Sequence, residues 1–388
     1  MANLRTKWMF LVALAALAAG FFALNEWQQE QREQAFEGKA KIRESGVVSP
    51  HVVASSANLP ASIPLAAPGS SFTPQTRLGF HVDNEWEPAI AADRSGHVYV
   101  IYPQYGGVPG CATCYSPTMI FQMSTDGGKT WGSPSVIYPA GSTAYQVDAQ
   151  IVVDPVDGQT VYAAWLQNNK SDILVGKSTD FGATWNFVLA DHTNAGTDKP
   201  ILAVRGQDVY VSYNHSQTAY VAYSHDGGAS FTEVKMNQNA KLGWSLGSGG
   251  TVMPNGKIFF SWEGYENNGG AKGPVNLYVS SSTDGGATWT TRTIDVSGAP
   301  PDCSSMSCGW AFLGAAMTMT SDASGNLYLL WNAGSTAGAP ERIYFASSTD
   351  GGATWSARKD VSTAPAGTHH AFPAIAAAGN GDVRIAWM

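Results

Sequence analysis

The chain has 388 residues and carries 22 basic and 30 acidic side chains, which gives a formal net charge of −8 at pH 7. Only 13% of the residues are charged and 42 are glycines, a composition that suits an all-β globular protein. Nucleic-acid binding is disfavoured, because phosphate backbones call for a face rich in lysine and arginine.

An apolar segment occupies the first 24 residues. Arg5 and Lys7 precede the apolar run Trp8–Leu24. This run is long for a signal-peptide core and slightly short for a membrane span, and no small-residue cleavage site follows it. We interpret it as an uncleaved anchor with its basic end inside, with a cleaved signal as the alternative. Either interpretation predicts an extracytoplasmic protein, membrane-anchored or secreted.

Residues 25–71 separate this segment from the expected folded domain, residues 72–388. Residues 28–44 are highly polar and predict a short helical stalk. The stretch that follows is rich in Ser, Ala and Pro and lacks strand alternation, which is typical of a linker.

The motif Ser-x-Asp-x-Gly-x-Thr-Trp recurs five times in the domain, with copies that begin 46 to 66 residues apart. It predicts a tight turn, because the aspartate can accept hydrogen bonds from its own turn and the glycine adopts φ values that other residues resist. The aromatic residue is expected to be buried where the next strand begins. Such a period indicates one repeated structural unit. The copies are Ser124–Trp131, Ser178–Trp185, Ser224–Phe231, Ser282–Trp289 and Ser348–Trp355, with Asp126, Asp180, Asp226, Asp284 and Asp350 as their aspartates.

A second pattern of six segments runs in phase with the motif. Each segment predicts a strand, a glycine turn and a second strand that ends on an aromatic residue. A third strand lies between each aromatic and the next motif, so each unit is predicted to be a four-stranded antiparallel sheet with the motif between its third and fourth strands. The aromatic residues are Tyr102, Trp165, Tyr213, Trp262, Trp331 and Trp387.

The motif is the Asp-box, or BNR repeat, and from about Asp83 to its end the chain resembles the sialidase-like Asp-box β-propellers. The resemblance implies an all-β, six-bladed β-propeller of four-stranded antiparallel blades. The last blade is predicted to be incomplete, because His369–Met388 supplies only two strands and no sixth Asp-box follows. We favour a natural protein that continues beyond Met388. The alternative is that residues 72–82 fold back to complete the ring.

Four cysteines form two local pairs, Cys111 with Cys114 and Cys303 with Cys308 in sequence. An exported protein favours disulfides over a zinc site, although four cysteines allow three pairings. Both pairs fall on the face of the propeller opposite the Asp-boxes.

That opposite face is the predicted binding face, because residues just before each innermost strand point toward the mouth of the central channel. Carboxylates, amides and indoles gathered there suit a glycan or a protein ligand. The alternative is that the acids cap strand ends and the tryptophans fill the channel. The predicted binding residues are Glu85, Trp86, Glu87, Gln150, Trp244, Trp310 and His370, and Lys199 occupies a position of the same kind.

The sialidase resemblance implies an Arg-Ile-Pro at the first blade, whose arginine helps to hold the carboxylate of sialic acid. Here the matching stretch is Trp86-Glu87-Pro88-Ala89, with a tryptophan in place of the arginine and an acid beside it. The remaining arginines do not lie at the inner strands of later blades. A carboxylate ligand would therefore meet repulsion at this point.

Candidate catalytic residues are carboxylates and one tyrosine. Asp148 and Asp198 occupy equivalent positions in neighbouring blades and could act as the carboxylate pair of a glycoside hydrolase. Glu263 and Tyr265 are expected in the loop after the second strand of the fourth blade. No cofactor or metal is predicted, although His369 and His370 could join the acids around a metal ion. The sequence thus predicts a propeller that recognises glycans or a protein partner, with a glycoside hydrolase of altered substrate as the alternative.

Overall fold

The computed structural model describes residues 76–388, apart from 139–144, 194–196, 216–217, 238–243, 268–271 and 302–313. The chain divides into two compact units, Met1–Thr76 and Arg77–Met388, and the second contains every described strand. The predicted anchor, stalk and linker up to residue 75 lie outside the described residues. Within the described ranges, no helix is long and apolar enough to cross a membrane.

All the elements in the described part of the chain are β-strands, and the sheets they form are antiparallel. Five sheets have four strands in chain order, and a final sheet has two. The first sheet comprises β1 (Ala89–Ala92), β2 (Val98–Gln104), β3 (Thr118–Ser124) and β4 (Ser135–Val136), and the second comprises β5 (Val147–Val153), β6 (Val161–Gln167), β7 (Asp172–Ser178) and β8 (Asn186–His192). The third comprises β9 (Thr197–Arg205), β10 (Asp208–His215), β11 (Thr218–Ser224) and β12 (Thr232–Lys235), and the fourth comprises β13 (Trp244–Val252), β14 (Ile258–Asn267), β15 (Lys272–Ser282) and β16 (Thr290–Ser297). The fifth comprises β17 (Met317–Ser321), β18 (Leu327–Ala333), β19 (Arg342–Ser348) and β20 (Lys359–Asp360), and the last comprises β21 (Ala374–Ala378) and β22 (Asp382–Ala386).

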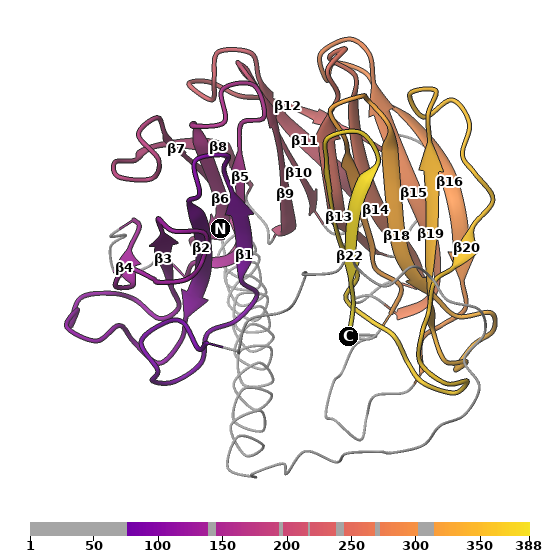
Figure 1. Cartoon of the computed structure of the whole chain (residues 1–388), viewed down its shortest axis with the longest axis horizontal. Coiled ribbons are helices and arrows are strands. Elements are labelled where there is room, and N and C mark those ends of the chain that lie inside the picture. The colour runs from indigo at the N-terminus through magenta and orange to yellow at the C-terminus, as the bar shows by residue number, and fades with distance from the viewer. Residues whose placement is uncertain are drawn as a thin grey trace, which may run out of the picture. The chain divides into compact units, whose positions relative to one another are not determined.

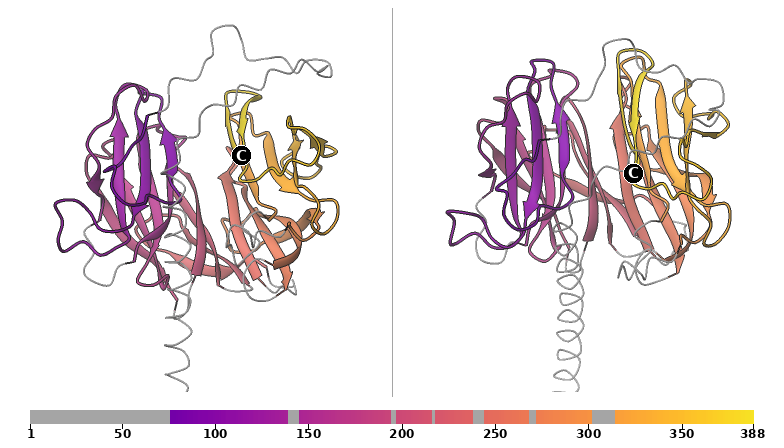
Figure 2. Two further views of the ribbon diagram at one scale, coloured as in Figure 1. Left: turned by 90° about the horizontal axis from the view of Figure 1, so that it is seen from below. Right: turned by 60° about the horizontal axis from the view of Figure 1, so that its bottom comes forward.

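The first strand of each sheet is the innermost one. β1, β5, β9, β13, β17 and β21 contact one another in that order, and the sheets follow one another in an arc (Figure 1). Figure 2 shows from two further directions that the first sheet and the β21–β22 hairpin stand at the two ends of this arc. The four-stranded antiparallel unit is confirmed, whereas closure of a six-bladed ring remains a prediction. Residues 76–82, the described part of the segment expected to complete the ring in the alternative arrangement, contain no strand.

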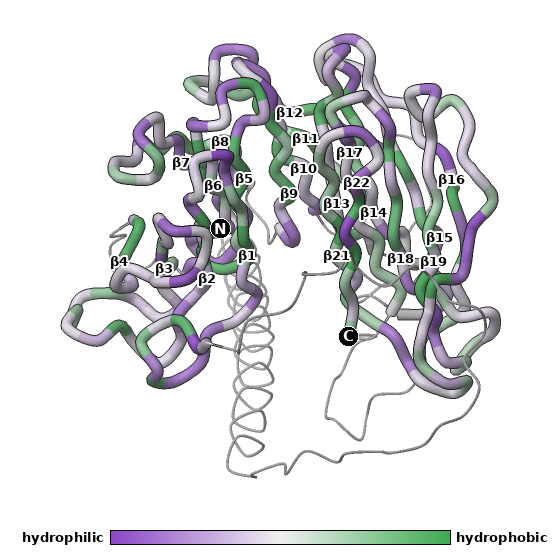
Figure 3. Tube along the Cα trace, viewed as in Figure 1, coloured by the Kyte–Doolittle hydropathy of each residue, from purple (hydrophilic) through white to green (hydrophobic). Residues whose placement is uncertain are grey.

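Apolar side chains fill the spaces between successive sheets. Figure 3 shows hydrophobic stretches along the strands and more hydrophilic residues in many of the connecting turns. Trp165 and Trp331 are among the largest fully buried side chains, and each belongs to a cluster shared by two neighbouring sheets. Side-chain hydrogen bonds also join neighbouring sheets, because Trp331 Nε1 donates to Asp295 Oδ2 at 2.9 Å and Tyr213 Oη donates to Asp191 Oδ2 at 2.6 Å. Packing between sheets therefore holds the domain together.

The Asp-boxes lie where the sequence predicts, between the third and fourth strands of the five four-stranded sheets. In the fourth sheet, Asp284 Oδ1 accepts hydrogen bonds from the Ser282 hydroxyl at 2.7 Å and from the Thr288 backbone N–H at 2.9 Å. Trp289 Nε1 donates to the Gly286 carbonyl at 2.8 Å. Hydrogen bonds from Thr288 and Ser282 lower the pKa of Asp284 to about 2, so it is ionised at neutral pH. The Asp-box aspartates therefore stabilise the turns in which they lie.

Candidate functional site

A residue in the left-handed region of backbone conformation lies just before or near the start of each of three neighbouring inner strands. The φ angles are 42° at Glu87, 57° at Asp148 and 46° at Lys199. β5 and β9 are both irregular at this point, because their registers with β6 and β10 shift there. Bulges of this kind re-aim a side chain away from the regular alternation, and non-glycine residues with positive φ cost energy. The backbone thus turns these three side chains toward a common site.

The side chains meet around one ammonium group. Lys199 Nζ contacts Glu87 Oε1 and lies 2.7 Å from Asp148 Oδ1. Asp198 lies close enough to Asp148 for their charges to interact, and Lys170, from the turn between β6 and β7, places its Nζ 3.7 Å from Asp198 Oδ1. We call Glu87, Asp148, Asp198, Lys170 and Lys199 the carboxylate cluster. It joins acids from three sheets that are separated by up to 111 positions in sequence (198 − 87).

The carboxylate cluster has a buried layer and an exposed layer. The side chains of Asp148 and Asp198 are 5% and 10% exposed, whereas those of Glu87 and Lys199 are 31% and 35% exposed. Burial and the nearby charge of Asp148 raise the pKa of Glu87 to about 8, although Lys199 opposes the shift. Burial alone would also raise the pKa of Asp148, but Lys199 and a hydrogen bond with Glu87 hold it well below its usual range. Near pH 7 the site therefore presents a protonated carboxyl, an ammonium and a carboxylate side by side.

Replacing Lys199 by methionine is expected to lower the free energy of unfolding by about 2 kcal/mol at pH 7, because Asp148 stays buried without its cation. Loss of one partner from a fully buried pair costs more, but Lys199 is about one third exposed and solvent weakens its interactions. Adding Asp148→Asn to this variant should recover most of the loss. Urea unfolding of the four chains of this double-mutant cycle measures the coupling, and additive losses would contradict the arrangement.

Three other predicted binding residues lie near the first two sheets. Glu85 forms an isolated bridge with Gln104, and its side chain faces Arg77 at 3.6 Å. The Trp86 backbone N–H donates to the Pro103 carbonyl at 3.2 Å. Gln150 lies in β5 opposite Ala164. These residues flank Glu87 and Asp148 of the cluster in sequence.

The remaining predicted residues belong to the fourth sheet and later parts of the chain. Trp244 begins β13 opposite Tyr265, but its side chain lies outside the described residues, as does the whole of Trp310. His370 is buried, its backbone N–H donates to the Glu341 carbonyl at 3.1 Å, and burial lowers its pKa. In the described ranges, no group of three or more His, Cys, Asp or Glu side chains is arranged to hold a metal ion.

Glu263 and Tyr265 lie inside β14 rather than in the loop after it, because β14 keeps its pairing with both neighbours beyond the position where the sequence pattern ends. Both side chains are buried. Glu263 Oε1 accepts a hydrogen bond from the Met317 backbone N–H at 2.6 Å, and Tyr265 Oη donates to the Ala315 carbonyl at 3.4 Å. These bonds connect the fourth sheet to the fifth. The placement of both residues is therefore that of structural links between sheets.

Sequence reasoning missed Lys170 and did not give Lys199 its central position. In the sequence, a proline directly follows both Glu87 and Lys199, and this shared pattern could have marked the two positions as related. Lys170 ends the turn Asn168–Lys170, in which all three residues have positive φ angles. The two adjacent asparagines are the sequence signal for such a turn, because asparagine tolerates positive φ.

The disulfide prediction is confirmed for one pair. Cys111 and Cys114 are bonded in the loop between β2 and β3, and their side chains pack against the apolar cluster of the first sheet. Cys303 and Cys308 lie outside the described residues.

Comparison with known proteins agrees with the repeat and the fold. The family described as a BNR repeat-like domain matches residues 69–304, which is more than half of the chain. The chain belongs to this family. No curated protein matches this BNR repeat-like chain.

Several solved structures resemble the BNR repeat-like chain in fold. NanB sialidase from Streptococcus pneumoniae, in complex with 2-[(3-chlorobenzyl)ammonio]ethanesulfonate, has a TM-score of 0.51 at 12% identity, over 81% of this chain and 66% of that one. The intramolecular trans-sialidase from Ruminococcus gnavus has a TM-score of 0.49 at 13% identity, over 76% and 87%. A protein of unknown function from Dyadobacter fermentans has a TM-score of 0.49 at 15% identity, over 78% and 90%. The chain thus spans just under two thirds of the NanB chain, and these identities indicate a shared fold alone.

Proposed function

We propose that the carboxylate cluster binds a glycan that is neutral or carries an amine, and that it does so without catalysis. The observation that carries the proposal is the convergence of Glu87 and Asp148, from the starts of two other inner strands, on Lys199 in β9. Sugar hydroxyls both donate and accept hydrogen bonds, and the cluster offers both kinds of group near pH 7. The exposed Glu87 and Lys199 would contact the ligand, while the buried acids would hold them in position.

An acidic sugar fits this site poorly. Trp86 and Glu87 stand where the sialidase resemblance implies an arginine, and both lysines of the cluster are already paired with its own acids. A carboxylate ligand would lose its hydration and gain no bidentate partner in the cluster. We therefore expect discrimination against sialic acid, in contrast to the sialidases that share the fold.

Glycoside hydrolysis is a second candidate function, favoured by one observation. The pKa of Glu87 is raised to about 8 and that of Asp148 is lowered, and such opposed shifts mark acid and base pairs in enzymes. However, the ammonium group of Lys199 contacts both carboxyl groups. Retaining glycosidases separate theirs by about 5 Å and inverting ones by more, which leaves room for substrate. Binding is therefore the better-supported proposal.

We propose two further features of the whole protein. The apolar run Trp8–Leu24 and the disulfide between Cys111 and Cys114 support an extracytoplasmic location, because disulfides persist in oxidising compartments. The β21–β22 hairpin pairs as the first two strands of the other sheets do, and β21 contacts β17. This repetition supports a sixth blade.

The experiment is to incubate the full-length chain with a mixed glycan pool that includes α-sialosides, and to identify bound and released sugars by mass spectrometry. We expect retention of neutral or amine-bearing glycans with no released sugar. Asp148→Asn should weaken retention about tenfold while the fold is unchanged, because it removes a charge that positions Lys199. Asp208→Asn is the matched control, since Asp208 pairs with His225 in the third sheet at 2.7 Å and is 40% exposed.

Release of a neutral sugar would replace the binding proposal by the hydrolase, and release of sialic acid would overturn the argument from charge. If the folded chain neither retains nor releases any glycan, glycan recognition is wrong. A search for a protein partner would then follow.

A further inference from the structure

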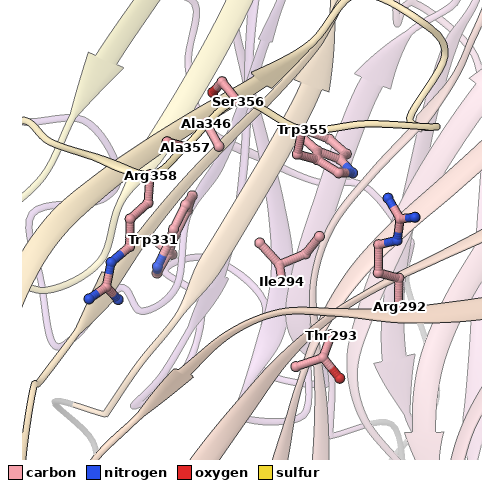
Figure 4. Close-up of a pocket in the computed structure, with 9 residues that line it drawn as sticks. All are labelled: Arg292, Thr293, Ile294, Trp331, Ala346, Trp355, Ser356, Ala357 and Arg358. Atoms are coloured by element: carbon pink, nitrogen blue, oxygen red, sulfur yellow. The ribbon is translucent and has the colours of Figure 1, made fainter.

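A second site lies between the outer strand of the fourth sheet and the middle strands of the fifth, where a pocket of about 380 Å³ opens (Figure 4). Its walls come from β16, β18 and β19 and from residues 355–358, which follow the fifth Asp-box. β20 has only two residues, whereas β16 has eight. Residues 355–358 therefore pass β19 as an irregular segment, which leaves this interface open. A volume of this size is in the range of small-molecule sites.

Two arginines lie at opposite ends of the pocket, and only Arg358 is paired with an acid (Figure 4). Arg358 Nη1 donates to both carboxylate oxygens of Asp295, at 2.9 and 2.7 Å, and its guanidinium lies 4.5 Å from the centre of the Tyr344 ring. Asp295 thus neutralises Arg358 and fixes its position. Arg292 Nη1 donates to the Ala353 carbonyl at 2.8 Å, and Arg292 forms no ion pair with any described residue. The pocket lining therefore carries one uncompensated positive charge.

Between the two arginines the surface is apolar. Ile294 lies between Trp331 and Trp355 (Figure 4). Trp331 is only 1% exposed and is held by its hydrogen bond to Asp295, so it forms the closed back of the pocket. Ile294 and Trp355 are partly exposed and offer a surface against which a ring can pack.

We propose that this pocket binds a ring-bearing ligand with a single carboxylate. The ring packs on Ile294 and Trp355, and the carboxylate accepts hydrogen bonds from Nε and Nη2 of Arg292, which have no partner among the described residues. A guanidinium matches a carboxylate in a bidentate geometry, which a lysine cannot reproduce. An aromatic acid and a uronic acid share this chemistry. This ligand class is anionic, whereas the ligand proposed for the carboxylate cluster is neutral or carries an amine.

Isothermal titration calorimetry on the full-length chain tests the proposal with benzoate and D-glucuronate, each beside its neutral counterpart, benzamide and glucose. We expect at least one acid to bind about tenfold more tightly than its neutral counterpart. Tighter benzoate would indicate an aromatic acid, and tighter glucuronate would indicate a sugar acid. Arg292→Gln should remove the preference for the acid, and Arg292→Lys should keep only part of it.

Two control variants separate this site from the rest of the molecule. Arg384→Gln removes an exposed guanidinium that pairs with Asp382 in the last sheet, and it should leave binding unchanged. Asp148→Asn should also leave it unchanged, because Asp148 belongs to the carboxylate cluster. Equal binding of acid and neutral probes, an unaltered preference in Arg292→Gln with its fold intact, or no binding of any probe below about 10 mM would overturn the proposal.

Discussion

Replacing Glu263 by glutamine is expected to stabilise the protein at high pH, by up to about 4 kcal/mol near pH 8. Burial raises the pKa of Glu263 from 4.5 to about 8, although hydrogen bonds from Met317 and Ser248 oppose the shift. The folded chain therefore holds a proton that the unfolded chain releases above about pH 4.5. The free energy of unfolding of the wild type falls as pH rises from about 4.5 to about 8, and glutamine removes that loss.

Glutamine preserves the contact that positions this side chain, because its Oε1 can accept the same hydrogen bond from Met317. The fifth sheet already contains an amide side chain in this role, because Asn332 Oδ1 accepts a hydrogen bond from the Ala316 backbone N–H at 2.9 Å. Urea unfolding at pH 5, 6.5 and 8 measures the effect, with the exposed Asp208→Asn as control. If wild type and variant keep a constant difference across this range, Glu263 does not carry its proton into the folded state.

Trp165→Ala is expected to lower the free energy of unfolding by about 3 to 5 kcal/mol, the usual cost of truncating a large buried aromatic side chain. The Trp165 side chain is fully buried, and its ring centre lies 5.6 Å from that of Phe187 and 6.2 Å from that of Tyr138. The residue also lies in β6 opposite the irregular part of β5 that carries Asp148. Its loss should therefore weaken ligand binding at the carboxylate cluster as well as stability.

Trp165→Phe is the matched control for this variant. The Trp165 indole N–H is buried without a hydrogen-bond partner among the described residues, so phenylalanine loses packing volume but no hydrogen bond. We expect a loss below about 1.5 kcal/mol. Chemical unfolding and glycan retention measured on the same samples test both expectations. A Trp165→Ala chain with wild-type stability would mean that the interface between the first two sheets contributes little.

The five four-stranded sheets could be predicted because their signals are local. Each Asp-box closes its hydrogen bonds within eight residues, as in Ser282–Trp289, and such a motif needs no distant partner to be recognised. The aromatic residues of the second strands were equally visible, although Trp165, Trp262 and Trp331 lie inside their strands rather than at the ends, and all three are fully buried. Glu263 was misplaced because the extension of β14 depends on pairing with its neighbours, which composition does not reveal.

The sequence by itself determined the repeat, the all-β class and the four-stranded antiparallel unit, because all of these follow from spacing along the chain. Only the tertiary structure decided which charged groups meet. Lys199 reaches Asp148 across 51 positions and Glu87 across 112, through bulges that redirect the side chains. The pocket beside Arg292 likewise depends on the shortness of β20. Contacts of this kind, and the pKa shifts that burial produces, arise when sheets pack together and have no counterpart in local sequence.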